Sequence, residues 1–186
     1  NNVKRMLAYS SIGHTGFALM AIVTFSAQGV SSLIYYLAVY ALANIAALAL
    51  ATYFSNVAGA ENASDYKGLG SKHPVASVSF VVVLISLTGL PVTAGFTAKL
   101  FVFSAVYGVY QQGHDSWLLA LLITGALTTV VSLFYYIKIP LNLFLKRKKN
   151  TAIEPLSDYK LQLFCAIISV FLLLAGIFPD FLYKLF

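Results

Sequence analysis

The chain has 186 residues, of which 60% are hydrophobic and only 10% are charged, and its formal net charge at pH 7 is +6. Soluble domains carry about 25% charged residues, and the acidic residues here lie between or at the ends of long apolar stretches. The composition therefore excludes a soluble globular protein and predicts a polytopic membrane protein, whose positive charge follows the positive-inside rule and implies no nucleic-acid partner.

Five apolar stretches are long enough to cross a bilayer, because a spanning helix needs about 20 apolar residues. They predict an all-α transmembrane bundle in a single membrane domain, residues 1–186, with helices at residues 6–25, 32–53, 75–110, 117–144 and 161–178. The chain opens with NNVKRML, without an initiator methionine, and the first apolar stretch begins at once. We therefore expect the C-terminal part of a longer protein or a truncated reading frame.

The third apolar stretch is too long for one crossing. An unbroken helix over residues 75–110 would measure about 54 Å, whereas the hydrocarbon core is about 30 Å thick. The sequence GLPVTAGF at 89–96 contains Gly89, Pro91 and Gly95, and these residues predict a helix break. The stretch is then either one crossing built from two half-helices or a hairpin of two helices that turns back at Gly-Leu-Pro.

Loop charges favour the single broken crossing. With a hairpin, the basic residues of the loops divide evenly between the two sides of the membrane. With one broken crossing, only Lys184 lies opposite the others, and the positive-inside rule favours that arrangement. We therefore predict five crossings, the third of them broken, and basic loops that face the cytoplasm or its organellar equivalent. The residues that share this side are Lys4, Arg5, Lys67, Lys72, Lys146, Arg147, Lys148, Lys149 and Lys160.

Lys99 follows the break by one helical turn and lies within the apolar stretch. A break at membrane depth exposes backbone groups that protein or water must satisfy, and such breaks form ion sites in transporters. A lysine at that depth is costly unless it is paired, hydrated or neutral, and burial disfavours its charged form, so it can exchange a proton. We interpret Lys99 as a proton relay. The alternative is an ammonium group that snorkels to the interface.

His14 is the second candidate relay. It lies in the sequence YSSIGHTG, on the same helix face as Ser10 and one turn away from it. Histidine titrates near neutral pH and suits a proton path. A neutral ring that hydrogen-bonds to a neighbouring helix explains the position equally well.

Lys138 is the third candidate relay, near the end of the fourth stretch after SLFYYI. Snorkelling to the membrane surface is the favoured interpretation, with a role in the proton path as the alternative. The adjacent Tyr135 and Tyr136 are predicted to be interfacial belt residues rather than hydroxyls that hold a water chain. The single cysteine, Cys165, allows neither an internal disulfide nor a cysteine metal site, and we expect no bound metal.

Four stretches together resemble the antiporter-like, proton-translocating subunits of respiratory complex I, the NADH-quinone oxidoreductase. Residues 2–22, NVKRMLAYSSIGHTGFALMAI, resemble the opening of one helix, and residues 65–74, DYKGLGSKHP, resemble the loop before a broken helix. Residues 86–106, SLTGLPVTAGFTAKLFVFSAV, are similar to that broken helix, and residues 133–139, LFYYIKI, resemble the helix after it.

Within this family, the chain resembles the C-terminal part of the N-type subunits. The M-type carries a glutamate at the position of Lys99, and the L- and M-types carry a histidine and a lysine on the helix that matches residues 32–53, which has neither. The L-type also continues into a long lateral helix, whereas this sequence stops at Phe186, one span later. The D-type subunit of multisubunit cation/proton antiporters shares the general motif and is the alternative. A non-transporting assembly scaffold is a further alternative.

The resemblance implies that Lys99 is a central protonatable residue and that His14 and Lys138 match polar positions of less defined role. It implies no cofactor in this chain, with NADH, FMN, iron–sulfur clusters and quinone in other subunits. Partners would be neighbouring antiporter-like and small membrane subunits, in a bacterial inner membrane or an organellar one. The family's upstream membrane glutamate and two further lysines have no counterpart in these 186 residues, so proton transfer would need the missing N-terminal part or a partner chain.

Overall fold

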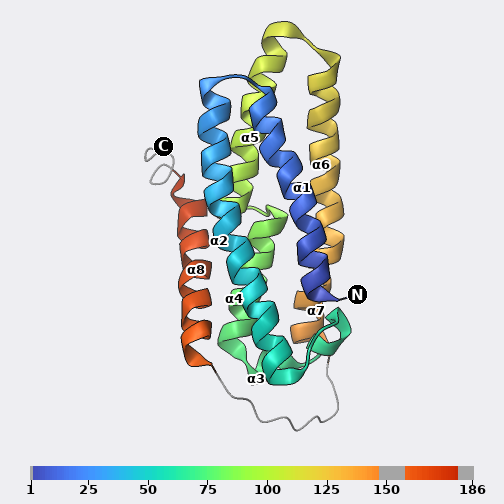
Figure 1. Ribbon diagram of the computed structural model, residues 1–186, viewed down its shortest axis with the longest axis vertical. Coiled ribbons are helices and arrows are strands. Elements are labelled where there is room, and N and C mark those ends of the chain that lie inside the picture. Colours follow the sequence, from blue (N-terminus) through green and yellow to red (C-terminus); the bar gives the residue numbers. More distant parts are fainter. Residues whose placement is uncertain (1, 147–157, 180–186) are drawn as a thin grey trace.

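The computed structural model describes residues 2–146 and 158–179, which form an elongated bundle of helices (Figure 1). In the described residues the only β-type pairing is an isolated bridge between Asn2 and Asn62. The predicted all-α bundle is therefore confirmed. The elements are α1 (Val3–Val23), α2 (Ala27–Ala58), the 3-10 helix η1 (Ala63–Tyr66), α3 (Leu69–Lys72), α4 (Pro74–Thr88), α5 (Ala94–Gly113), α6 (Ser116–Tyr136), α7 (Lys138–Leu145) and α8 (Tyr159–Ile177).

Local sequence explains where the long helices begin and end. The side chains of Asn2 and Ser26 accept hydrogen bonds from the backbone amides of Arg5 and Gly29, which caps the N-termini of α1 and α2. Such caps satisfy amides that lack a partner within the helix. Helix α2 ends where Gly59 adopts a left-handed conformation at φ +60°, which glycine adopts without steric cost.

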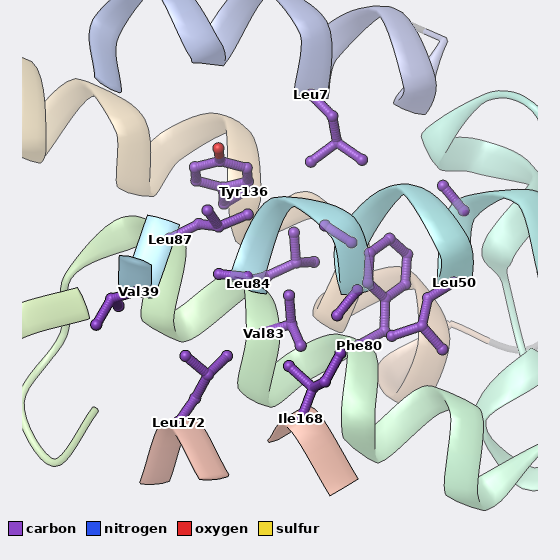
Figure 2. Close-up of a cluster of buried hydrophobic side chains, with 14 of the residues drawn as sticks. Leu7, Val39, Leu50, Phe80, Val83, Leu84, Leu87, Tyr136, Ile168 and Leu172 are labelled. Carbon is purple, nitrogen blue, oxygen red and sulfur yellow. The ribbon is translucent and has the colours of Figure 1, made fainter. Parts of the chain in front are cut away.

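Helix α2 is the centre of the bundle and packs against α1, α4, α5 and α8. Its buried face carries several alanines, among them Ala43, Ala46 and Ala47. Small residues let neighbouring helices approach closely, which matters in a membrane because apolar burial alone does not drive helices together. Figure 2 shows the core at one level of the bundle, where Phe80, Leu84 and other side chains of α4 meet Leu50 of α2 and Ile168 and Leu172 of α8.

The outer surface of the bundle is apolar. Four helical stretches are long and apolar enough to cross a membrane: α1, α2, residues Ser116–Leu145 and α8. Exposed large hydrophobic residues lie on these helices, for example Ile12, Ile45, Leu127 and Ile167. Because water would disfavour such a surface, the chain is an integral membrane protein. The predicted helix at 117–144 corresponds to α6 and α7, which meet at Ile137.

The long third stretch is divided between α4 and α5, which are separated by the non-helical residues 89–93. Helix α4 occupies the lower half of the bundle in Figure 1 and α5 the upper half, so the two together run its length. That they make one crossing of a bilayer stays a prediction.

The described basic residues of the loops gather at the lower end of Figure 1. This end holds the start of α1 with Lys4 and Arg5, the segment around α3, the end of α7 and the start of α8. One broken crossing requires such an arrangement. Arg147, Lys148, Lys149 and Lys184, which entered the same prediction, lie outside the described residues.

Candidate functional site

The break between α4 and α5 leaves a backbone carbonyl available to a side chain. Gly89, at φ +82°, ends α4, and its amide donates to the carbonyls of Ile85 and Ser86. The amide of Leu90 also donates to Ile85. The last carbonyl of the helix, that of Thr88, accepts instead from the Lys99 ammonium, with Nζ at 2.7 Å. The C-terminal end of a helix carries partial negative charge, so it suits a cation.

Lys99 is buried within the bundle, with 5% of its surface exposed. Its Nζ lies 4.8 Å from the centre of the Phe17 ring, in a cation–π contact. Its alkyl chain crosses Gly89, where an added Cβ would lie 2.7 Å from Lys99 Cδ. The side chain therefore does not snorkel to the surface, and glycine at position 89 provides both the left-handed turn and the space for it.

Gly95 has a role that the sequence did not predict. It lies inside the first turn of α5 rather than in the break, so its interpretation as a helix-breaking residue is wrong. Its amide donates to Ser86 Oγ at 3.2 Å, and a Cβ at this position would lie 1.8 Å from the Ser86 carbonyl oxygen. Gly95 thus allows α5 to approach α4 closely. Pro91 lies in the break and is exposed.

A small cavity between α1, α2, α4 and α5 brings Lys99 and His14 together. The volume open to the centre of a water molecule is about 10 Å³, about the space that one water needs. No carboxylate is among the residues that line the cavity. These are His14, Tyr36, Val39, Tyr40, Ala43, Ser86, Leu87, Gly95, Ala98 and Lys99.

His14 is held by two tyrosines of α2. Its Nδ1 and the Tyr36 hydroxyl are joined by a hydrogen bond of 2.8 Å. Its ring stacks on Tyr40, with the ring centres 4.4 Å apart. The hydrogen bond to a neighbouring helix, which was one of the two interpretations of His14, is therefore present. It does not exclude a relay role, because His14 and Lys99 line the same cavity.

A second polar cluster lies one turn below His14 on α1. Tyr136 has 1% of its surface exposed, and its hydroxyl donates to Ser10 Oγ at 2.6 Å. The rings of Tyr135 and Tyr136 lie against each other, with their centres 4.6 Å apart. The prediction that Tyr136 belongs to an interfacial belt is therefore wrong, because its hydroxyl finds a partner inside the bundle.

Lys138 is not brought to the Lys99 cavity. It is the first residue of α7 and is exposed. It lines a separate cavity at the basic end together with Arg5, Tyr9 and Tyr135. This position fits the snorkelling interpretation. Tyr135 lines the same cavity and packs against the buried Tyr136.

The tyrosines of α2 were missed in the sequence. Tyr36 and Tyr40 are spaced four residues apart in an apolar helix, which places them on one face. That spacing was a usable signal, but only the fold shows that this face meets His14. A further polar cluster was also missed: the Tyr53 hydroxyl contacts His73 Nδ1 at 3.0 Å and accepts from Gln162 Nε2 at 2.8 Å, which joins α2, the start of α4 and α8.

Comparisons with known proteins agree on one family. Residues 1–131 match the NADH:quinone oxidoreductase/Mrp antiporter transmembrane family. The chain is 43% identical over 150 residues to "NADH-quinone oxidoreductase subunit N 2" of Chloroherpeton thalassium, covering 81% of this chain and 28% of that protein. It is 40% identical over 182 residues to "NADH-quinone oxidoreductase subunit N" of Chlorobium chlorochromatii, covering 95% of this chain and 34% of that protein. The chain thus spans about a third of the length of the curated relatives it matches.

Solved structures share the fold. A chain of respiratory complex I from Thermus thermophilus with bound aureothin is 28% identical, with a TM-score of 0.79 over 99% of this chain and 40% of that one. A chain of the Mrp complex from Dietzia sp. DQ12-45-1b reaches a TM-score of 0.80 at 19% identity over 96% of this chain and 40% of that one. The second likeness establishes the fold alone.

Proposed function

Because this chain belongs to the NADH:quinone oxidoreductase/Mrp antiporter transmembrane family, we propose that it is part of subunit N of a proton-translocating NADH:quinone oxidoreductase. Its relatives at 32–43% identity are named as subunits N of that enzyme. The likeness to the Mrp complex is at 19% identity and does not favour the antiporter alternative. NADH, FMN, iron–sulfur clusters and quinone would reside in other subunits of the complex, within a bacterial plasma membrane.

The observation that carries this proposal is the buried Lys99 at the helix break. Its ammonium has a carbonyl, an aromatic face and a small cavity around it, and no carboxylate lines that cavity. Ionisable residues inside membrane proteins pair with one another or with backbone carbonyls, and they mark ion pathways and proton relays. No negatively charged side chain lines the cavity to hold the proton on Lys99, so the side chain can release it, as a relay requires.

His14 supplies the acceptor on the other side of the cavity. The cavity has room for about one water, which can carry a proton from Lys99 Nζ to the imidazole ring. Two positive charges in a small cavity without a carboxylate repel each other strongly. The site therefore holds one extra proton at a time, either on Lys99 or on His14, and a proton that arrives at one of them displaces the proton from the other.

Redox chemistry in other subunits would drive this exchange by changing the electrostatic environment of Lys99. Thr88 and Gly89 lie at the C-terminal end of α4, so a small movement of this helix would displace the Thr88 carbonyl from Lys99 Nζ. Within the described residues, this is the only carbonyl to which Nζ donates a hydrogen bond. Loss of that bond would favour the neutral amine. The break thus couples movement of the helix to the charge on Lys99.

The test is proton pumping by the assembled enzyme in membrane vesicles that carry Lys99→Met or Lys99→Arg. Methionine keeps the length of the side chain and removes the charge, whereas arginine keeps the charge but does not release its proton. Both variants should abolish pumping if Lys99 is a relay. Lys160→Ala removes an exposed lysine at the start of α8 and is the matched control.

Three outcomes separate the alternatives. Loss of pumping in both variants, in complexes that still assemble, supports the relay. Normal pumping with Lys99→Arg but not with Lys99→Met would mean that only the charge matters. Normal pumping with both, or a defect confined to assembly, would favour the scaffold alternative and refute the proposal.

A further inference from the structure

A second, larger cavity opens at the basic end of the bundle, where α1 begins and α6 meets α7. Its volume open to the centre of a water molecule is about 440 Å³, and pockets of about 300–1,000 Å³ are typical for small ligands. Arg5 and Tyr9 of α1, Tyr135 of α6 and Lys138 of α7 are among its lining residues. The cavity therefore combines two cationic side chains with two aromatic ones.

The two cationic side chains have no acidic partner in the described part of the chain. Arg5 and Lys138 are exposed, and neither forms an ion pair there. Glu61 and Asp65 lie close to the lining residue Asn62 in the sequence, but no carboxylate lines the cavity. The Asp65 carboxylate already accepts from the Asn62 amide at 2.8 Å. An anion in this cavity would therefore meet two positive charges and no negative one.

Exposed apolar and aromatic side chains continue from the cavity along the outside of both helices. On each helix they follow a cation at intervals of one helical turn, which places them on the same face as the cation. The row on α1 is Arg5, Tyr9 and Ile12, and the row on α6 and α7 is Lys138, Phe134 and Val131. The four uncharged side chains are each more than half exposed. Charge thus lies at the basic end, and apolar surface extends from it towards the middle of the bundle.

The two rows belong to helices that lie side by side (Figure 1). The Tyr136 hydroxyl donates to Ser10 Oγ at 2.6 Å, and a Cβ added at Gly13 would lie 3.8 Å from Thr128 Cγ2. These contacts join α1 to α6 over the same turns that carry the rows. One amphipathic molecule can therefore touch both rows at once.

We propose that this cavity binds the phosphate group of an acidic phospholipid, whose acyl chains lie along the exposed rows of α1 and α6. The guanidinium of Arg5 offers a planar fork of donors that matches two phosphate oxygens, and Lys138 adds a point charge. The Tyr9 hydroxyl can donate a further hydrogen bond to the headgroup. The inference goes beyond the proposed function, because it does not require Lys99 to release a proton.

The surroundings of the cavity favour an acidic lipid over a free anion or a neutral lipid. By the charge of its loops the basic end faces the cytoplasm, and the cytoplasmic leaflet carries anionic lipids. A free phosphate would leave the apolar rows unused, whereas acyl chains cover them. Phosphatidylcholine would bring its own ammonium group towards Arg5 and Lys138, and like charges repel.

The test is photo-crosslinking of the purified enzyme complex that contains this chain, in a mild detergent. The probe is a phosphatidylglycerol with a diazirine in one acyl chain, and labelled peptides are identified by mass spectrometry. We expect label on α1 and α6 around Ile12 and Phe134. One charge on the lipid is worth about fivefold in affinity, so unlabelled phosphatidylglycerol should displace the probe at about a fifth of the phosphatidylcholine concentration or less. Inorganic phosphate is the third competitor and should displace little.

Three variants of the complex test the two cations. Arg5→Gln and Lys138→Gln each remove one charge and keep a polar side chain, so each should lower the affinity for the probe about fivefold. Lys160→Gln is the matched control, because Lys160 is exposed at the same end of the bundle but does not line the cavity. It should stay within about twofold of the unchanged complex.

Labelling that phosphatidylglycerol competes away and that both cavity variants weaken supports the site. Equal competition by phosphatidylcholine would mean ordinary lipid contact, and equal competition by inorganic phosphate would mean a free-anion site; either result refutes the inference. Absence of label from α1 and α6, as expected if a protein segment fills the cavity, refutes it too, as do cavity variants that bind like Lys160→Gln. If neither cavity variant assembles, competition on the unchanged complex decides.

The same probe separates this inference from the proposed function. Lys99 does not line the larger cavity, so the Lys99→Met complex should bind the probe like the unchanged complex. If Lys99→Met pumps protons normally and the labelling is present, the proposed function fails and the lipid site stands. If pumping is lost and the labelling is absent from the unchanged complex, only the lipid site fails.

Discussion

Replacing Gly95 with alanine should move α5 away from α4 without changing any charge. The added Cβ would lie 1.8 Å from the Ser86 carbonyl oxygen, whereas an ordinary contact begins at 3.4 Å. Ser86 belongs to the buried face of α4, so its backbone cannot yield easily. The two helices must separate locally by about 1.6 Å for that contact to reach van der Waals distance.

The cost of this change follows from two losses. Overpacking a core costs about 1–3 kcal/mol, and the hydrogen bond from the Gly95 amide to Ser86 Oγ contributes about 1 kcal/mol. Together they predict a destabilisation of about 2–4 kcal/mol, or a fall in Tm of about 5–15 °C for a chain of this size. Lys99 lies one turn later on the same helix, so its 2.7 Å bond to the Thr88 carbonyl should also be disturbed.

The assay is thermal unfolding of the purified complex together with its pumping rate per assembled complex. Gly16→Ala is the control, because Gly16 is an exposed residue of α1 with nothing within 4 Å of an added Cβ. That change should be neutral or stabilising by about 0.5–1 kcal/mol. If Gly95→Ala leaves both Tm and pumping at the level of Gly16→Ala, the close approach of α4 and α5 does not position Lys99 and the reasoning is refuted.

Two further predictions concern the ends of helices. Ser26→Ala removes the cap at the Gly29 amide and should cost about 1 kcal/mol, seen as a lower Tm; an unchanged Tm would show that water replaces the cap. The pKa of Asp65 is lowered, chiefly by the hydrogen bond from the Asn62 amide. This carboxylate therefore stabilises the fold above its unfolded pKa of about 4, and the contribution is lost as pH falls through the lower folded value. Asp65→Asn should accordingly lower Tm at pH 7 but not at pH values below the folded pKa, and an equal loss at both would contradict the assignment.

Much of the fold could be predicted from hydrophobic patterning. Each predicted apolar stretch contains one long helix or, for residues 75–110 and 117–144, two. The observed helix ends differ from the predicted ones, most clearly for α2, which runs from Ala27 to Ala58 rather than over residues 32–53. Helix α1, in contrast, ends at Val23, before the predicted residue 25. Caps fix such ends, and a hydropathy pattern does not reveal them.

The site was predicted only in part. Lys99 and His14 were selected from the sequence because ionisable groups at membrane depth are costly and therefore informative. Tyr36, Tyr40 and Tyr136 were not selected, since tyrosine is common at membrane interfaces and its hydroxyl reveals nothing until a partner is known. Their proximity depends on which faces α1, α2 and α6 present to one another.

A membrane-embedded helical bundle with a break before Lys99 could be predicted from the chain alone, because length, hydropathy and the positions of glycine and proline are local properties. The surroundings of Lys99, in contrast, depend on how the helices pack. Residues from four helices line its cavity, and Tyr136 meets Ser10 across 126 positions of the chain. Such contacts depend on the packing of small residues such as Gly95 between helices, which carries no periodic signal along the chain.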